Sequence, residues 1–256
     1  MRLDVEQLGF SYDARRTILE DVTFSLAGTG IYCILGKNGT GKSTLLKCIV
    51  GEHGGTGRVL LDGKERGAYG QRELARKIAY IPQNHTPTFP FRVLDVVMMG
   101  RTAHMRYFAS PGAREAEIAL HYLSFLGIAH LAEQPYTNIS GGERQLVLLA
   151  AALTQQPEFL IIDEPTAHLD FGNAHRFLGL VLRLHAQGIG ILMTTHFPDH
   201  ALYLAAETLV LKDKTLWKHG AAAEVIDEAG MSALYGLPVH IAQIGTRTVC
   251  VGGDIA

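Results

Sequence analysis

The chain has 256 residues, of which 47% are hydrophobic and 19% are charged, and its formal net charge is −2. This length suits one domain with an inserted subdomain, and the composition excludes a disordered or fibrous protein. The balanced charge disfavours non-specific nucleic-acid binding, which needs a clustered positive surface. The longest apolar runs are far shorter than the roughly 20 residues that a membrane-spanning helix needs, and acidic residues near the N-terminus argue against a signal peptide. The chain is therefore expected to stay in the cytoplasm.

The first part of the chain predicts strands and one helix. Residues 1–28 contain short extended runs, which are typical of a small antiparallel sheet. The apolar run 31–35, between Gly30 and Gly36, predicts a strand that is buried on both faces. The elements expected next are a helix at about 42–50, a hairpin arm at 58–63 that ends in an Asp-Gly turn, and a buried strand at 78–81.

The middle of the chain is different in character. Residues 85–156 begin with a proline-rich loop and then show helical periodicity without a convincing strand. The helices are expected at about 93–100, 113–126 and 142–155. Buried strands return at 159–162 and 189–195, around a helix at about 173–187. Beyond residue 208, a hairpin and short helices are expected to finish the chain, without a separate C-terminal domain.

This order of elements predicts an α/β fold in one domain, residues 1–256. The core is expected to be a mainly parallel sheet covered by helices. An antiparallel β-subdomain precedes it, and an all-helical subdomain is inserted at 85–156.

A phosphate-binding motif follows the predicted strand 31–35. Residues 36–44 read Gly-Lys-Asn-Gly-Thr-Gly-Lys-Ser-Thr, which fits G-x-x-x-x-G-K-[ST] between a strand and a helix, the pattern of P-loop enzymes. Glycines let the backbone turn its N–H groups towards phosphate oxygens, and the helix N-terminus adds a partial positive charge. Lys42 would contact the β- and γ-phosphates of ATP, and Ser43 would hold Mg²⁺. The residues expected to bind the nucleotide here are Gly36, Asn38, Gly39, Gly41, Lys42, Ser43 and Thr44.

Two carboxylates follow the predicted strand 159–162. Asp163 and Glu164 stand at its carboxyl end, where ligands collect in open α/β sheets. Asp163 would hold Mg²⁺, and Glu164 would act as the general base that polarises the water attacking the γ-phosphate. The alternative is that both side chains cap the helix that follows.

Residues 138–145 resemble the signature of ABC ATPases. They read Asn-Ile-Ser-Gly-Gly-Glu-Arg-Gln, where the family usually has Leu-Ser-Gly-Gly-Gln, and they precede Asp163 by about 20 residues, as in the family. Ile139 and Glu143 replace the usual Leu and Gln. The chain is thus similar to the nucleotide-binding subunits of ABC transporters over about residues 1–220. Ser140 and Glu143 also form a capping-box pattern, and both interpretations can hold together.

The resemblance implies a head-to-tail dimer that closes on two ATP molecules. Ser140, Gly141 and Gly142 of one copy would complete the nucleotide site of the other copy. Asp170 would lie in the loop that crosses this interface. His168, in the same loop, stands where the family commonly has a small residue, and no role is assigned to it.

Three further residues acquire roles only through the resemblance. Tyr12 resembles the aromatic residue that stacks on adenine, Gln83 resembles the glutamine that reports Mg²⁺ occupancy, and His196 resembles the histidine that contacts the γ-phosphate. Without the resemblance, they read as a packing tyrosine, a loop residue and a structural histidine. His196 and His200 are four residues apart, but Pro198 interrupts a helix between them and argues against a zinc site. Lys42, Glu164 and His196 are the expected catalytic residues, and Ser43, Gln83 and Asp163 the expected Mg²⁺ ligands.

The inserted helical segment is where this family docks its membrane permease. Residues 93–101 are apolar with two methionines, which suits an adaptable contact surface, although core packing explains some of these side chains. This segment, with 102–104 and 171–173, is similar to importers of metal chelates (ferric siderophore, haem, cobalamin) and of molybdate or tungstate.

Import would require membrane permease subunits and an extracytoplasmic substrate-binding protein. The chain would then lie on the cytoplasmic face of the inner membrane. The alternatives are a stand-alone subunit of an ABC exporter and a non-transport ABC ATPase that acts on nucleic acid. The slightly acidic balance disfavours the second, so no nucleic-acid partner is expected.

Overall fold

The computed structural model describes residues 1–13, 16–83, 89–106, 109–167 and 169–253. The chain divides into two compact units, one formed by Met1–Ala68 with Gly190–Ala256 and the other by Tyr69–Ile189. His168 lies outside the described residues. Among the described residues, every helix is too short or too polar to cross a lipid bilayer.

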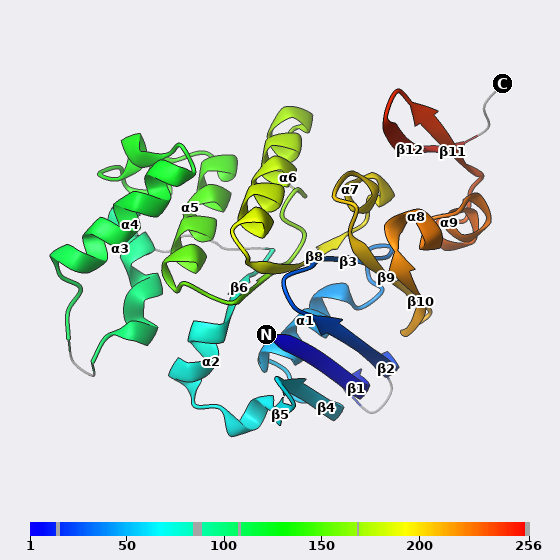
Figure 1. Ribbon diagram of the computed structural model, residues 1–256, viewed down its shortest axis with the longest axis horizontal. Coiled ribbons are helices and arrows are strands. Elements are labelled where there is room, and N and C mark those ends of the chain that lie inside the picture. Colours follow the sequence, from blue (N-terminus) through cyan, green and yellow to red (C-terminus); the bar gives the residue numbers. More distant parts are fainter. Residues whose placement is uncertain (14–15, 84–88, 107–108, 168, 254–256) are drawn as a thin grey trace. The chain divides into compact units, whose positions relative to one another are not determined.

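The first unit contains the antiparallel sheet that the sequence predicts near the N-terminus. Its strands are β1 (Arg2–Ser11), β2 (Thr17–Ala27), β4 (Thr56–Leu61) and β5 (Lys64–Glu65), in the order β2-β1-β4-β5 (Figure 1). Apolar side chains alternate along β2, so that Val22, Phe24 and Leu26 are buried while the residues between them are exposed. The β4–β5 turn has Asp62 at φ 51° and Gly63 at φ 76°, the conformation that an Asp-Gly hairpin turn requires.

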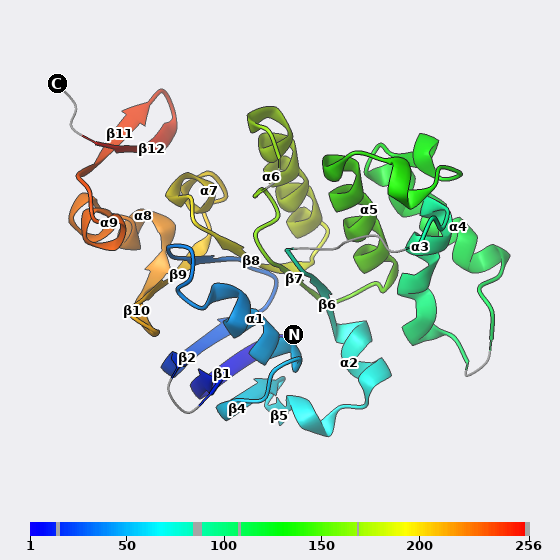
Figure 2. The same cartoon turned by 180° about the vertical axis from the view of Figure 1, so that it is seen from behind.

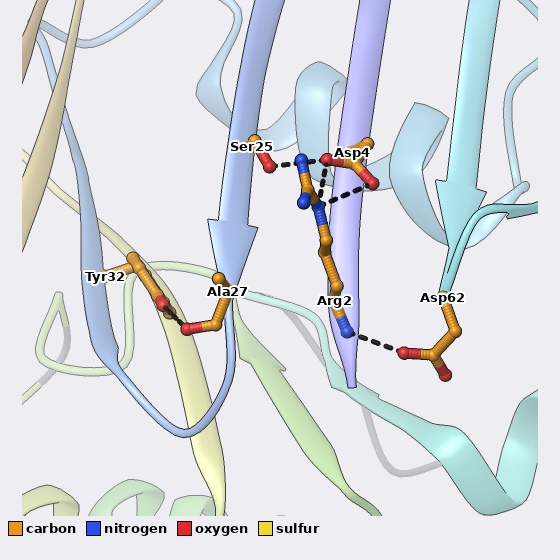
Figure 3. Close-up of polar contacts among 6 residues, drawn as sticks. All are labelled: Arg2, Asp4, Ser25, Ala27, Tyr32 and Asp62. Carbon is orange, nitrogen blue, oxygen red and sulfur yellow. Dashed lines mark hydrogen bonds and ion pairs between the residues drawn. The ribbon is translucent and has the colours of Figure 1, made fainter.

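Polar contacts secure the ends of these strands (Figure 3). The Asp4 carboxylate on β1 accepts hydrogen bonds from the Ser25 hydroxyl on β2 and, at 2.8 Å, from Nε of Arg2. The main-chain amide of Arg2 donates to Asp62 Oδ1 at 2.8 Å. The Tyr32 hydroxyl donates to the Ala27 carbonyl at 2.6 Å and so closes the turn between β2 and the next strand.

The parallel part of the first unit is built around β3 (Ile31–Leu35). All five residues of β3 are buried, and it runs parallel to β8 (Gly190–Thr195) and β9 (Glu207–Lys212). Strand β10 (Thr215–Ala221) extends the sheet by an antiparallel hairpin with β9. The helix α1 (Lys42–Val50) follows β3 and contacts β1 (Figure 2). The predicted bounds of β3 and α1 are confirmed, and the strand expected at 189–195 begins one residue later.

The C-terminal part of the first unit has more structure than the sequence predicts. After α7 (Pro198–Tyr203) and the β9–β10 hairpin come α8 (Ala222–Val225) and α9 (Glu228–Tyr235). The expected hairpin and short helices are therefore present, but a second hairpin that the sequence did not predict, β11 (Val239–Ile244) with β12 (Arg247–Gly252), follows them. This hairpin packs β12 against α7 and β11 against α9 (Figure 1).

The described residues of the second unit form two strands and a group of helices. Its parallel strands are β6 (Ile78–Ile81) and β7 (Phe159–Ile162), with Ile78 beside Phe159 and Ile81 beside Ile162. Its α-helices are α2 (Gln71–Lys77), α3 (Val93–Met99), α4 (Ala113–Phe125), α5 (Gly141–Thr154) and α6 (Phe171–Ala186). The described residues between β6 and β7 contain no strand, as expected.

Close packing fixes α5 against α3 (Figure 2). A Cβ added to Gly100 would lie 2.0 Å from the Ala151 carbonyl oxygen, so only glycine permits this approach. The Thr154 hydroxyl lies 3.0 Å from the Val97 carbonyl oxygen, and the buried Arg101 guanidinium donates to the Thr154 carbonyl. Helix α5, which begins at the predicted signature, is therefore anchored along its C-terminal half.

Candidate functional site

The predicted phosphate loop connects β3 directly to α1. Gly39 and Gly41 have φ values of 81° and 96°, a region that residues with a Cβ rarely adopt. A Cβ on Gly36 would lie 2.8 Å from the Leu211 carbonyl oxygen, so the loop also packs tightly against β9. These glycines let the backbone curl at the N-terminus of α1, where amide groups face outward for an anion.

Lys42 is the central cation of this loop. Only 4% of the residue is exposed, and its ammonium group donates to the Gly36 and Lys37 carbonyl oxygens at 2.9 and 3.0 Å. These bonds hold the charge within the loop, where it can meet β- and γ-phosphate oxygens. Ser43 follows in the first turn of α1, and Thr44 beside it is buried. The loop therefore fits a triphosphate.

Tyr12 belongs to an aromatic cluster beside the phosphate loop. It follows β1 directly, is 56% exposed, and its hydroxyl lies 3.4 Å from the Thr44 hydroxyl. Phe10 meets its ring edge-on at 4.9 Å, and His53 stacks on Phe10 at 5.0 Å. An exposed ring held in this way suits stacking on a nucleobase. Sequence reasoning missed Phe10 and His53, and only the alternation of Phe10 with Tyr12 could have indicated the first.

His196 follows β8 in a short turn before α7. Its carbonyl oxygen accepts a hydrogen bond from the Tyr235 hydroxyl at 2.9 Å. The Thr195 hydroxyl lies 3.0 Å from both the Phe197 amide and Nδ1 of His200. Because α7 begins only at Pro198, His196 and His200 do not share a helix.

The second unit brings Gln83 and the Asp163–Glu164 pair together at the ends of β6 and β7. The Asp163 amide donates to the Ile81 carbonyl at 2.9 Å, and the residue is 2% exposed. Glu164 Oε2 accepts a hydrogen bond from Nε2 of Gln83 at 3.2 Å. Glu164 adopts φ 43°, a strained value for a residue with a side chain. A carboxylate held beside a glutamine at this edge can position a water molecule.

The capping alternative for Asp163 and Glu164 is wrong. Helix α6 begins at Phe171, and Asp170 is its N-cap, accepting from the Asn173 amide at 2.8 Å. The Asp163–Glu164 pair instead ends β7 and leads into a turn closed by a 3.1 Å bond from the Ala167 amide to the Glu164 carbonyl. Asp170 therefore has a structural task at the start of α6.

The predicted signature forms the N-terminus of α5. The Glu143 amide donates to the Ser140 hydroxyl at 3.3 Å, while the Glu143 carboxylate accepts from the Ser140 amide and hydroxyl at 2.8 and 2.7 Å. This is the capping box that the sequence predicts. Hydrogen bonds from the Ser140 hydroxyl and amide lower the pKa of the Glu143 carboxyl. Gly141 is exposed and Gly142 half-buried, so the helix tip is accessible.

A groove of about 620 Å³ runs beside the signature between α5 and α6. Ser140, Gly142 and Glu143 contribute its wall on the α5 side, and Asn173 and Arg176 contribute to the wall on the α6 side. Ser140 of the signature therefore lines a groove that is formed within the second unit.

The expected site residues are divided between the two units. The phosphate loop, Tyr12 and His196 belong to the first unit, and the other expected site residues to the second. The latter are Gln83, Ser140, Gly141, Gly142, Asp163, Glu164 and Asp170. Within the second unit, the side chains of Gln83 and Glu164 are joined by a hydrogen bond.

Comparison with known proteins places this geometry in a family. The family model described as ABC transporter matches residues 19–167, which include the phosphate loop, the signature and the Asp163–Glu164 pair. The chain belongs to this family. It contains the ATP-binding domain of an ABC transporter and is an ATPase. The resemblance inferred from residues 138–145 is thus confirmed.

Individual relatives of this ABC ATPase are similar over nearly their full length. An uncharacterised ABC transporter ATP-binding protein of Haemophilus influenzae is 39% identical over 92% of this chain and 89% of its own. The molybdate import ATP-binding protein MolC of the same organism is 35% identical over 93% and 89%. An ABC transporter assigned to the metal-chelate type, solved in an inward-facing conformation, superposes with a TM-score of 0.86 at 33% identity, covering 98% of this chain and 96% of that one. The predicted P-loop fold is confirmed by this likeness.

Proposed function

We propose that this ATPase powers an importer by closing as a head-to-tail dimer on two ATP molecules. One observation supports the dimer above the others: the same chain carries a phosphate loop with a buried lysine and an accessible signature at a serine-capped helix tip. A single copy provides one of each. In a head-to-tail pair, the Ser140–Gly142 tip of each copy would complete the ATP site of the other.

Each site residue then has a task in hydrolysis. Lys42 would bind the β- and γ-phosphates, and His196 would contact the γ-phosphate. Ser43, Gln83 and Asp163 would hold Mg²⁺, since hydroxyl, amide and carboxylate oxygens are the ligands that this ion prefers. When bound, Mg²⁺ neutralises charge between the phosphates. Tyr12, a residue that is 56% exposed, would stack on adenine.

Glu164 would orient and deprotonate the attacking water. Its carboxylate lies 3.2 Å from the side-chain nitrogen of Gln83, so the glutamine amide oxygen remains available for a metal ion. After cleavage, repulsion between the separated phosphates would reopen the dimer. Gln83 would therefore connect metal occupancy with the position of the base.

The segment around α3 is the proposed contact with a membrane permease. Val93, Leu94 and Val97 are buried and form part of the core, whereas Phe91 and Met99 are 49% and 51% exposed. Both interpretations of this sequence segment can therefore hold together. Some of its apolar side chains pack in the core, and others are exposed and suit an adaptable contact with a partner.

The proposed cargo is a metal chelate or a related oxyanion such as molybdate. The relatives that support this are MolC and the metal-chelate type transporter. The ATPase would sit on the cytoplasmic face of the inner membrane, bound to permease subunits that receive cargo from an extracytoplasmic binding protein. In such an arrangement, the ATPase itself does not contact the cargo.

Glu164→Gln tests the mechanism. The variant is expected to bind ATP, to hydrolyse it at least about 100-fold more slowly, and to accumulate an ATP-dependent dimer on size exclusion. Glu158→Gln is the matched control, because Glu158 precedes the same strand but pairs with Lys77 on the surface. Wild-type turnover by Glu164→Gln would reject the base, and a monomer in saturating ATP would reject the dimer.

Serine substitutions test the permease surface. Phe91→Ser and Met99→Ser are expected to reduce co-purification with a polytopic membrane protein while leaving ATP hydrolysis by the isolated chain intact. Leu182→Ser on α6 is the control, since this leucine is similarly exposed (37%) but lies outside the proposed contact. Equal co-purification of all three variants would contradict the proposed surface.

A further inference from the structure

The C-terminal part of the first unit contacts the turn that carries His196. Tyr235 ends α9, and its hydroxyl donates to the His196 carbonyl oxygen at 2.9 Å. Burial, together with the nearby Cys250 and Asp199, raises the pKa of Tyr235. The hydroxyl therefore stays protonated and remains a donor throughout the physiological pH range.

Two other contacts hold the same turn. Asp199, in the first turn of α7, accepts a hydrogen bond from the Cys250 amide of β12 at 2.8 Å. Within the turn itself, the Thr195 hydroxyl at the end of β8 lies 3.0 Å from the Phe197 amide. The turn is thus fixed by its own strand and by two separate parts of the C-terminal segment, residues 222–252.

The C-terminal segment also runs beside the phosphate loop. Gly236 follows Tyr235 with φ 74°, and a Cβ built on it would lie 3.6 Å from the Lys37 ammonium nitrogen. Lys37 is the second residue of the phosphate loop. The two-residue stretch 235–236 therefore bonds to the turn that presents His196 and lies near the Lys37 side chain of the phosphate loop.

We propose that Tyr235 is a positioning residue, which holds the His196 backbone so that the imidazole keeps the orientation needed to meet the γ-phosphate. This inference rests on the proposed role of His196 in hydrolysis. Without the Tyr235 bond, the His196 carbonyl loses an anchor that fixes the turn to α9, and the turn gains conformational freedom. The C-terminal segment then contributes to catalysis through the turn it braces, without touching nucleotide.

The test compares two tyrosines that make the same kind of bond. Tyr235→Phe removes the bond to His196, and Tyr32→Phe removes the bond to Ala27, the last residue of β2 (Figure 3). For Tyr235→Phe, the kcat of ATP hydrolysis is expected to fall about fivefold, the factor that one neutral hydrogen bond contributes, with little change in KM. Tyr32→Phe is expected to keep the wild-type kcat. Equal kcat values for the two variants would overturn the inference.

A double-mutant cycle separates positioning from general destabilisation. With enzyme in excess over ATP, Tyr235→Phe is expected to have no further effect on hydrolysis in a His196→Ala background, because its effect passes through His196. Additive losses would contradict the inference. If Tyr235→Phe melts below the assay temperature, Asp199→Ala is used in its place, because it removes the other contact between the C-terminal segment and the same turn. Asp199→Ala is expected to lower kcat without changing KM.

The same variants distinguish failure of the inference from failure of the proposed function. Wild-type turnover by His196→Ala would reject the role of His196 and, with it, the positioning role of Tyr235. A strong loss in His196→Ala with no loss in Tyr235→Phe would reject the positioning role alone.

Discussion

Two helices of this ABC ATPase begin at glycine-containing segments that are predicted to meet phosphate, and their N-termini are built differently. Helix α1 follows Gly41, which has no side chain to accept hydrogen bonds from the first amides. Helix α5 follows Ser140, whose hydroxyl forms a capping box with Glu143. The first tip leaves its amides for a ligand, whereas the capping box of the second already satisfies the Ser140 and Glu143 amides. One tip is built to bind phosphate by itself, and the other to be stable and available to a partner.

The largest effect is expected from removing the charge at the α1 tip. Lys42→Ala should weaken ATP binding about 100-fold, since a hydrogen bond to a charged group contributes up to about 3 kcal/mol. Titration with a fluorescent ATP analogue measures this loss. Lys47→Ala, on the same helix but beyond the phosphate loop, is the control and should bind as the wild type does. If Lys42→Ala and Lys47→Ala bound ATP with similar affinity, the α1 tip would not be the phosphate-binding tip that the comparison with α5 assumes.

Substitutions of Ser140 separate the two tasks of the α5 tip. Ser140→Ala should lose about 1 kcal/mol of stability together with at least about tenfold in turnover, because both the cap and the proposed phosphate contact disappear. Ser140→Asn keeps a good N-cap but lacks the hydroxyl, so thermal stability should recover while turnover does not. Melting curves and steady-state hydrolysis measure the two quantities. Turnover that recovers in Ser140→Asn would mean that the serine acts as a cap only.

The smallest effect concerns acid stability at the α5 tip. The pKa of Glu143 is lowered from its usual value of 4.5 by hydrogen bonds from Ser140. A lowered folded-state pKa stabilises the protein above the unfolded-state pKa, and the contribution is lost as the pH falls through the folded value. The melting temperatures of wild type and Glu143→Gln should therefore differ most near pH 7 and converge below about pH 4. A difference that stays constant down to pH 3.5 would contradict this contribution.

The parts of the fold that the sequence predicted well are those with a single dominant signal. The uninterrupted apolar run 31–35 can only be satisfied by burial on both faces, and β3 has these bounds. Helix α1 ends at Val50, where Gly51 adopts φ 91°. The Asp62-Gly63 turn was recognisable because that dipeptide favours the conformation it adopts.

The missed elements have weak local signals. Helix α2, Gln71–Lys77, has no fully buried residue, so its sequence lacks the apolar periodicity that marks a helix. Strands β11 and β12 are half-exposed and depend on packing against α7 and α9.

Among the site residues, too, the strong local sequence patterns were predicted, and the contacts that depend on tertiary packing were not. The phosphate loop and the capping box at Ser140 are local patterns, so spacing alone was sufficient to predict them. The contact between Gln83 and Glu164 joins residues 81 positions apart, and the contact between Tyr235 and His196 spans 39 positions. Contacts of this kind depend on tertiary packing, and no pattern in a single sequence encodes their distances.

The backbone conformation of Glu164 affects how this protein would respond to selection for thermostability. At φ 43°, the residue occupies a conformation that glycine adopts freely and that a side chain makes unfavourable by roughly 1 kcal/mol. A search for heat-resistant variants would therefore reward Glu164→Gly while destroying the proposed general base. Selection for thermostability in this enzyme should always be paired with a screen for turnover.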